Sequence, residues 1–172
     1  MEQIETLEHK WYAVYVKSRH EFQVYERLNK KQIEAFLPIV ERLRRWKDRK
    51  KLITFPLFPG YLFVCISKSA QERLSVLKIK GVVRLLSSLP GDPDPIPDEQ
   101  INSLKRLMEN KEALDPYPYI DKGQRVRIKG GPLKGVEGIL VEKLDKHLLV
   151  LSVDVLRQGV ALTIDAADVE KI

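Results

Sequence analysis

Two apolar runs in the first half of the chain predict the central strands of a sheet. Trp11 to Val16 is apolar throughout, and Tyr61 to Ile66 is rich in aromatic and β-branched residues. In the second run, the period of two places Tyr61, Phe63 and Cys65 on one face and the intervening residues on the other. Two interpretations of the side that carries Tyr61 and Phe63 stay open: these aromatic residues pack in a core, or they form a docking patch.

Three helices are predicted around these strands. Ser18-Arg19-His20-Glu21 and Ser69-Ala70-Gln71-Glu72 match the capping box, in which serine and glutamate side chains bond each other's amides. A third helix is expected to begin near Pro97 and Asp98. The apolar residues expected to face inward from the three helices are Phe22, Val24, Tyr25 and Leu28, then Leu74 and Leu77, then Ile101, Leu104, Leu107 and Met108. Strands and helices in this order predict an α+β fold, with an antiparallel sheet covered by helices on one side.

A basic hairpin is predicted before the second central strand. Extended segments from Ala35 to Leu43 and from Leu52 to Phe55 flank a charged tip. Glu41 to Lys51 contains seven Lys and Arg and two acidic residues. Trp46 lies in this tip, where its indole stacks either on the neighbouring hairpin strand or on nucleic acid.

The pattern changes after Asp115-Pro116-Tyr117-Pro118. These prolines predict a linker over residues 115–120, between a domain at 1–114 and a second at 121–172. The second domain is best closed as a small β-barrel, because short strands without helices would otherwise expose their edges. Its expected strands are Gln124–Lys129, Val136–Glu142, Leu148–Val155 and Val160–Ile164.

Charge is divided unevenly between the two halves. Residues 1–89 hold 18 Lys and Arg against 9 Asp and Glu, whereas residues 90–172 hold 12 against 15. A polyanion such as a nucleic-acid backbone is the natural partner for the basic half.

Composition excludes several other classes of protein. The acidic N-terminus and the lack of a long apolar run indicate a cytoplasmic protein with no membrane segment. A single cysteine, Cys65, excludes an internal disulfide, and scattered histidines make a metal site improbable. No nucleophile–base pattern or carboxylate pair indicates an enzyme, and no cofactor is expected.

The chain resembles the NusG family of transcription factors from Trp11 to Ile172. The resemblance rests on Trp11-Tyr12, the basic helix and hairpin, Phe58-Pro59-Gly60-Tyr61, the Pro-Ile-Pro helix start, and the loop Gly130-Gly131-Pro132-Leu133-Lys134-Gly135 with Gly138. That loop is similar to the KOW motif. The implied architecture is an NGN domain followed by an SH3-like KOW barrel, in a monomeric protein.

The resemblance implies a set of contacts with transcribing RNA polymerase. The aromatic strand would dock on the β′ clamp helices through Phe58, Tyr61 and Phe63. Gln71, Glu72 and Arg73 fall where relatives touch the β gate loop, although the hydroxyl-rich triplet of the specialised relative RfaH is absent. The non-template DNA strand would be contacted by Lys17, Arg27, Lys30, Lys31 and Lys80.

The resemblance also implies a role for the barrel and a place within the family. In relatives the KOW domain binds either Rho or the ribosomal protein NusE, and the matching positions are Pro132, Leu133, Gly135 and Leu156. Leu156 stands where the housekeeping factor has phenylalanine, and Pro56 to Val64 is closer to the RfaH and UpxY antiterminators. The sequence therefore favours an operon-specific antiterminator. The alternatives are a housekeeping NusG and a ribosome-associated RNA-binding protein with a KOW loop.

Overall fold

A computed structural model describes residues 7–172, which form two compact units. One unit contains residues 7–37 and 58–96. The other contains residues 38–57 and 97–172.

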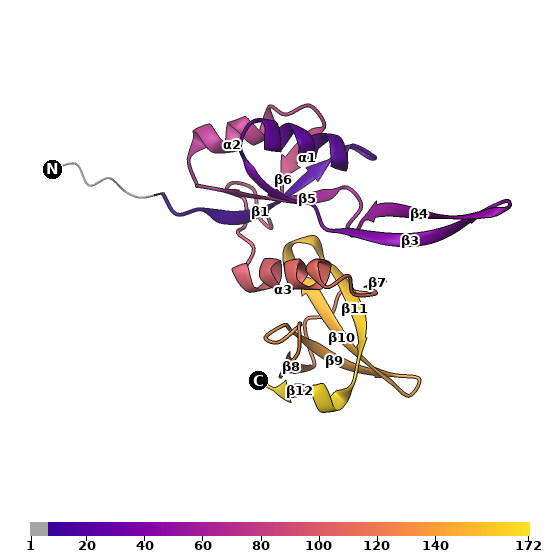
Figure 1. Cartoon of the computed structure of the whole chain (residues 1–172). Coiled ribbons are helices and arrows are strands. Elements are labelled where there is room, and N and C mark those ends of the chain that lie inside the picture. The colour runs from indigo at the N-terminus through magenta and orange to yellow at the C-terminus, as the bar shows by residue number, and fades with distance from the viewer. Residues whose placement is uncertain (1–6) are drawn as a thin grey trace. The chain divides into compact units, whose positions relative to one another are not determined.

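The first unit is an antiparallel sheet with two helices on one face (Figure 1). The strand order is β2-β5-β1-β6. The elements are β1 Lys10–Val16, α1 Glu21–Lys30, β2 Glu34–Phe36, β5 Tyr61–Ile66, α2 Ala70–Leu77 and β6 Val82–Leu85. Leu62, Val64 and Ile66 of β5 pack in the core with Val24 and Leu28 of α1. The predicted alternation of β5 and the α+β class are therefore confirmed.

The start of α1 differs from the predicted capping box. His20 occupies the cap position without a side-chain cap bond, and Ser18 lies in the preceding turn. The Glu21 side chain accepts from the Gly60 amide instead, at 2.8 Å, and Glu21 is only 6% exposed. The Glu21 carboxylate therefore bonds the distant Gly60 amide instead of the nearby Ser18 amide that a capping box would use. The second capping serine is confirmed, since Ser69 Oγ accepts from the Glu72 amide at 3.2 Å.

Three of the residues expected to face inward are exposed: Phe22, Leu74 and Leu77. Val24 and Leu28 are the fully buried apolar residues of α1, and Phe22 lies two positions before Val24, on a different side of the helix. In the short helix α2 only Val76 is buried. Val76 packs in the core cluster of this unit with Val24 and Leu28 of α1.

The predicted basic hairpin forms a two-stranded sheet of its own. It consists of β3, Ile39–Trp46, and β4, Arg49–Pro56 (Figure 1). Its ladder runs from Ile39 opposite Pro56 to Trp46 opposite Arg49.

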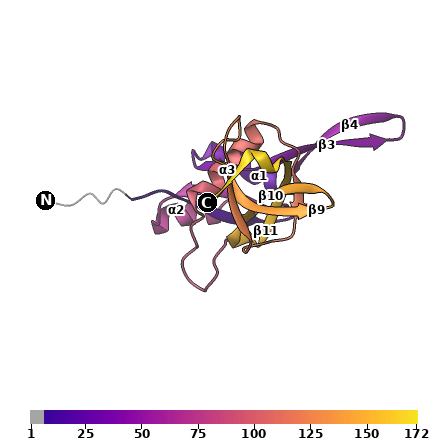
Figure 2. The same cartoon turned by 90° about the horizontal axis from the view of Figure 1, so that it is seen from below.

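The rest of the second unit is a helix and a six-stranded antiparallel sheet, in the order β12-β8-β9-β10-β11-β7. Strands β9, β10 and β11 curve strongly (Figure 2). The elements are α3 Asp98–Glu109, β7 Asp115–Tyr117, β8 Gln124–Ile128, β9 Glu137–Lys143, β10 Lys146–Val153, β11 Gln158–Ile164 and β12 Val169–Lys171, with 3₁₀ turns at Asp154–Leu156 and Ala166–Asp168. The four predicted strands are present, and β7 and β12 are additional. None of the helices in the described chain is long and apolar enough to cross a membrane.

Part of the predicted linker belongs to this sheet. Residues 115–117 form β7, which pairs with β11, so the prolines mark an edge strand rather than a free connection. Helix α3 contacts β10, and Gln100 Nε2 donates to Asp154 Oδ2 at 3.0 Å. The compact units thus differ from the expected ranges, and separate folding of 1–114 and 121–172 stays a prediction.

The bond between Glu21 and Gly60 predicts a stability effect. Glu21→Ala leaves a part-buried amide without its acceptor, so we expect the free energy of unfolding to fall by about 1–3 kcal/mol. Urea unfolding followed by circular dichroism measures this change. Glu26→Ala, at an exposed position of the same helix, is the control and should change stability by less than about 0.5 kcal/mol. Equal losses in the two variants would contradict the assignment.

Candidate functional site

The sheet face of the first unit opposite α1 and α2 carries a row of aromatic rings. The β1–β5 register sets Ala13 opposite Phe63, and the β2–β5 register sets Phe36 opposite Phe63. The ring of Phe36 lies 6.1 Å from that of Phe63 and 6.5 Å from that of Trp11. The Phe58 ring meets Phe63 edge-on at 6.2 Å. These distances are typical of favourable aromatic pairs.

Two tyrosines extend this row at the end nearest Gly60. Tyr15 pairs with Tyr61 across β1 and β5, and their rings are 5.4 Å apart. The Arg84 guanidinium lies 6.0 Å from the Tyr15 ring centre. We call the six residues Trp11, Tyr15, Phe36, Phe58, Tyr61 and Phe63 the aromatic face.

The three predicted docking residues differ in accessibility. Phe58 and Phe63 are 1% and 0% exposed, whereas Tyr61 is half-buried. Sequence reasoning missed Trp11, Tyr15 and Phe36. The period of two in β1 would have placed Trp11 and Tyr15 on one face, but only the strand register brings that face beside Phe63 and Tyr61.

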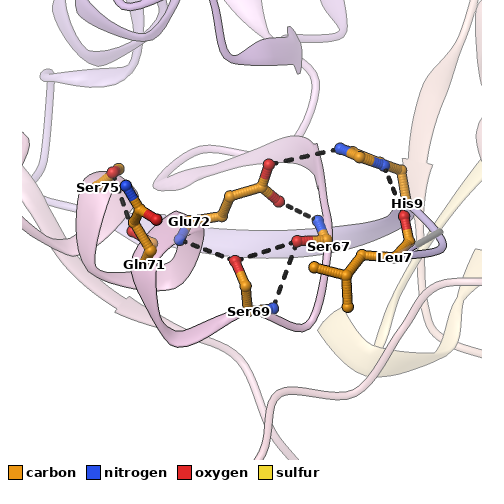
Figure 3. Close-up of polar contacts among 7 residues, drawn as sticks. All are labelled: Leu7, His9, Ser67, Ser69, Gln71, Glu72 and Ser75. Carbon is orange, nitrogen blue, oxygen red and sulfur yellow. Dashed lines mark hydrogen bonds and ion pairs between the residues drawn. The ribbon is translucent and has the colours of Figure 1, made fainter. Parts of the chain in front are cut away.

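Glu72 is held by bonds within the first unit (Figure 3). One carboxylate oxygen accepts from the Ser67 amide, and the other lies 3.5 Å from His9 Nε2. Hydrogen bonding from Ser67 holds the pKa of the Glu72 carboxyl below its ordinary value of 4.5. Partial burial opposes this effect, and the nearby His9 adds to it. Ser67 Oγ also donates to Ser69 Oγ at 3.1 Å, which ties the end of β5 to the start of α2.

Of the two residues that flank Glu72, Arg73 makes contacts within the unit and Gln71 lies at the surface. The Arg73 guanidinium donates to the Lys68 carbonyl at 2.9 and 3.2 Å and pairs with Asp92 at 2.7 Å. Gln71 is exposed. Of the three predicted gate-loop residues, Glu72 and Arg73 therefore have structural partners.

Three of the five predicted DNA-contacting residues, Lys17, Arg27 and Lys80, are brought together by hydrogen bonds to the carbonyls of Lys80 and Gly81. The Arg27 guanidinium donates to the Lys80 carbonyl at 2.6 Å, and the Lys17 amide donates to the Gly81 carbonyl at 2.8 Å. Lys30 and Lys31 lie three and four residues after Arg27, on the same side of α1 and its C-cap. All four lysines are exposed, and Arg27 is half-buried. We call these five residues the basic helix patch.

The predicted KOW contact residues lie on two different connections of the second unit. Pro132, Leu133 and Gly135 are in the β8–β9 loop, where Gly135 has φ +89°. A Cβ at Gly135 would come within 2.8 Å of Arg106 Nη1, which donates to the carbonyl of Lys134. Leu156 lies between β10 and β11 and is only 7% exposed.

No metal site is evident in this part of the molecule. Within residues 7–172, no group of three or more His, Cys, Asp or Glu side chains could hold a metal ion. A cavity of about 570 Å³ near the β2 edge is lined by residues that include His9, Lys31, Cys65 and Glu72.

The lowered pKa of Glu72 predicts a pH effect on stability. A depressed folded-state pKa contributes stability above the ordinary value of 4.5, and this contribution is lost as pH falls through the folded-state pKa. Glu72→Gln should therefore lose less stability than the wild type when the pH falls from about 5 to about 3. Urea unfolding at both pH values measures the difference. Glu26→Gln, on the exposed side of α1, should behave like the wild type, and the same behaviour from Glu72→Gln would contradict the prediction.

Comparison with known proteins agrees with this architecture. The family model described as "Transcription termination factor nusG" matches residues 9–105. The transcription termination/antitermination protein NusG of Borreliella burgdorferi is 26% identical over 184 residues, covering 94% of this chain and 98% of that protein. The protein of the same name from Halalkalibacterium halodurans is 24% identical over 178 residues, covering 96% and 100%.

A solved structure has a similar fold. The structure described as "Domain interaction in Thermotoga maritima NusG" aligns over 96% of this chain and 98% of that chain, with a TM-score of 0.57 and 23% identity. The family match covers more than half of the chain and includes both central strands and the aromatic segment. The chain belongs to the NusG family of transcription termination and antitermination factors.

Proposed function

We propose that this protein binds transcribing RNA polymerase through the aromatic face and suppresses pausing. The observation that carries the proposal is the pairing of Tyr15 with Tyr61 at the accessible end of the aromatic face. Aromatic side chains bury a large area with few rotatable bonds, and they dominate the energetics of interfaces. The proposed partner is the β′ clamp helices of the polymerase.

The buried members of the aromatic face have a supporting role in this proposal. Phe58 and Phe63 are shielded from solvent, so they support the aromatic face from within and offer little contact surface themselves. Truncating either of them would leave a cavity, at about 3–5 kcal/mol for Phe→Ala in a core. Loss of binding in such variants would not distinguish docking from unfolding. Tyr61 is therefore the residue that tests the contact.

The α2 segment is proposed to meet the β gate loop across the polymerase cleft. Gln71 is the accessible residue for this contact. Glu72 and Arg73 hold the segment in place through Ser67, Lys68 and Asp92. A factor that contacts both sides of the cleft favours the closed clamp, because it binds that conformation better than the paused one.

The basic helix patch is proposed to contact phosphates of the non-template strand. Its four lysines are exposed, while the Arg27 guanidinium holds the Lys80 segment against α1. We therefore assign phosphate contacts to Lys17, Lys30, Lys31 and Lys80, and a positioning role to Arg27. With these contacts, the proposed place of action is the cytoplasm.

The KOW-like sheet is proposed to recruit Rho or NusE through its β8–β9 loop. Pro132 is exposed and Leu133 is half-buried, whereas Leu156 offers little surface. A weakened contact at Leu156 would suit an operon-specific paralogue that avoids one of the two partners. A housekeeping factor is the second candidate, and it is favoured by the name NusG that the relatives from Borreliella burgdorferi and Halalkalibacterium halodurans carry.

Tyr61→Ala tests the proposed docking. We expect it to weaken binding to core RNA polymerase by about 2 kcal/mol, the range of interface hot spots, while the protein stays folded. Binding is measured by titrating labelled full-length protein with polymerase, and circular dichroism checks the fold. Phe22→Ala is the matched control, because Phe22 is an exposed aromatic residue of α1, on the helix side of the sheet. The proposal fails if Tyr61→Ala binds normally or if both variants lose affinity equally.

Lys30→Gln/Lys31→Gln tests the DNA contact without disturbing Arg27. Each lost single-strand phosphate contact should lower the slope of log K against log salt by roughly 0.7, so the pair should lower it by roughly 1.4. The measurement is binding of the full-length protein to a labelled duplex with an unpaired bubble over a range of salt concentrations. Lys143→Gln/Lys146→Gln removes equal charge from the exposed β9–β10 turn and should keep the wild-type slope. Equal slopes for all three proteins would refute the assignment.

A further inference from the structure

The strand register of the β3–β4 hairpin sorts its side chains onto two different faces. Residues directly opposite each other in an antiparallel ladder point to the same side, and the side alternates along each strand. Trp46 lies opposite Arg49, and Arg44 lies opposite Lys51, two positions further from the tip. These four side chains therefore share one face. We call it the Trp46 face, and its remaining members are Val40, Arg42, Ile53 and Phe55.

The charge of the hairpin is concentrated on the Trp46 face. This face has four cations and no acidic residue: Arg42, Arg44, Arg49 and Lys51. The opposite face carries the exposed pair Leu43 and Leu52, with Arg45, Lys50 and the acidic Glu41. The sequence shows only the total charge of the arm. The register shows that one face holds most of the net charge.

The cations of the Trp46 face have no acidic partner. Within residues 7–172, no ion pair joins any of them to a carboxylate, and every residue from Glu41 to Leu52 is exposed. Arg44 lies directly opposite Lys51, an arrangement of like charges that destabilises a ladder. The Arg44 guanidinium instead lies 4.8 Å from the Phe55 ring centre, which helps hold it on this face.

An exposed indole completes the face. Trp46 is 63% exposed at the last ladder position before the turn at Lys47. If the Trp46 indole were covered by stacking on the neighbouring hairpin strand, it would be less exposed than this. A large apolar ring beside cations is the combination used to bind unpaired nucleotides, because bases stack on the ring while phosphates meet the charges.

We propose that the Trp46 face binds single-stranded nucleic acid. Arg42 and Arg44 are alternate residues of one strand, so about 7 Å separates them along the ribbon. With Arg49 and Lys51 they form a row that suits a chain of phosphates rather than one anion. Trp46 stacks on an unpaired base, which a duplex does not offer because its bases are stacked inside. This site is separate from the basic helix patch, which lies on the other compact unit.

The hairpin supplies a closely matched pair of variants for the test. Arg44→Gln/Lys51→Gln removes two cross-strand cations from the Trp46 face. Arg45→Gln/Lys50→Gln removes two cross-strand cations from the opposite face, one position along each strand. The two variants have equal net charge, and all four positions are exposed. Any difference between them therefore reports which face binds.

The probe is a fluorescein-labelled oligothymidylate of about 15 nucleotides, titrated with full-length protein at several salt concentrations. We expect Arg44→Gln/Lys51→Gln to lower the salt slope by roughly 1.4 and Arg45→Gln/Lys50→Gln to leave it unchanged. Trp46→Ala should weaken binding about tenfold, and Trp46→Phe should retain most of the affinity. Equal loss in the two charge variants would overturn the proposal, as would a full-strength Trp46→Ala variant.

Intrinsic fluorescence gives a second, local readout. The protein has two tryptophans, and Trp11 is 7% exposed whereas Trp46 is 63% exposed, so added oligonucleotide should quench mainly Trp46. The unchanged emission of Trp11 in Trp46→Phe checks that the fold is intact. Unlabelled duplex or polyphosphate that competes as well as the single strand, at equal phosphate concentration, would also overturn the proposal. Quenching that persists in Lys30→Gln/Lys31→Gln separates this site from the basic helix patch, so either proposal can fail alone.

Discussion

The first compact unit depends on the buried carboxylate of Glu21. Glu21 is only 6% exposed as a residue, and its carboxylate finds a hydrogen-bond partner in the Gly60 amide. The Gly60 carbonyl in turn accepts from the Val16 amide at 2.9 Å, so one residue joins the start of α1, the end of β1 and the start of β5. The φ of +87° at Gly60 is strained for residues with a Cβ. Tyr61, the first residue of β5, directly follows Gly60, and its ring lies beside that of Tyr15.

Part of the acidic charge of the first compact unit is used in internal hydrogen bonds. Glu21, Glu72, Asp92 and Asp94 all accept from groups of the first unit. The exposed lysines of the basic helix patch are therefore not neutralised by these acids. The electrostatic field of these exposed lysines attracts polyanions at long range, and this attraction weakens with added salt.

The hairpin concentrates charge at a small local cost in free energy. Two unit charges 4 Å apart in water interact by about 1 kcal/mol, so opposed cations on an exposed ribbon are tolerated. The same charges gain much more from a polyanion, because binding releases its condensed counterions. A surface that is slightly unfavourable alone and favourable with a partner is typical of functional sites, where some local stability is given up.

The sequence alone determined most of the helices and strands and the family. The apolar periods, the Ser69 cap and the Phe58-Pro59-Gly60-Tyr61 turn are local signals, and the predicted strands, helices and resemblance followed from them. The tertiary structure decided which side chains meet. Glu21 bonds a residue 39 positions away rather than its own cap, and Phe58 and Phe63 are buried while Tyr61 is accessible. Strand pairing and long-range hydrogen bonds bring together residues far apart in the sequence, and a local apolar pattern does not show which partners meet.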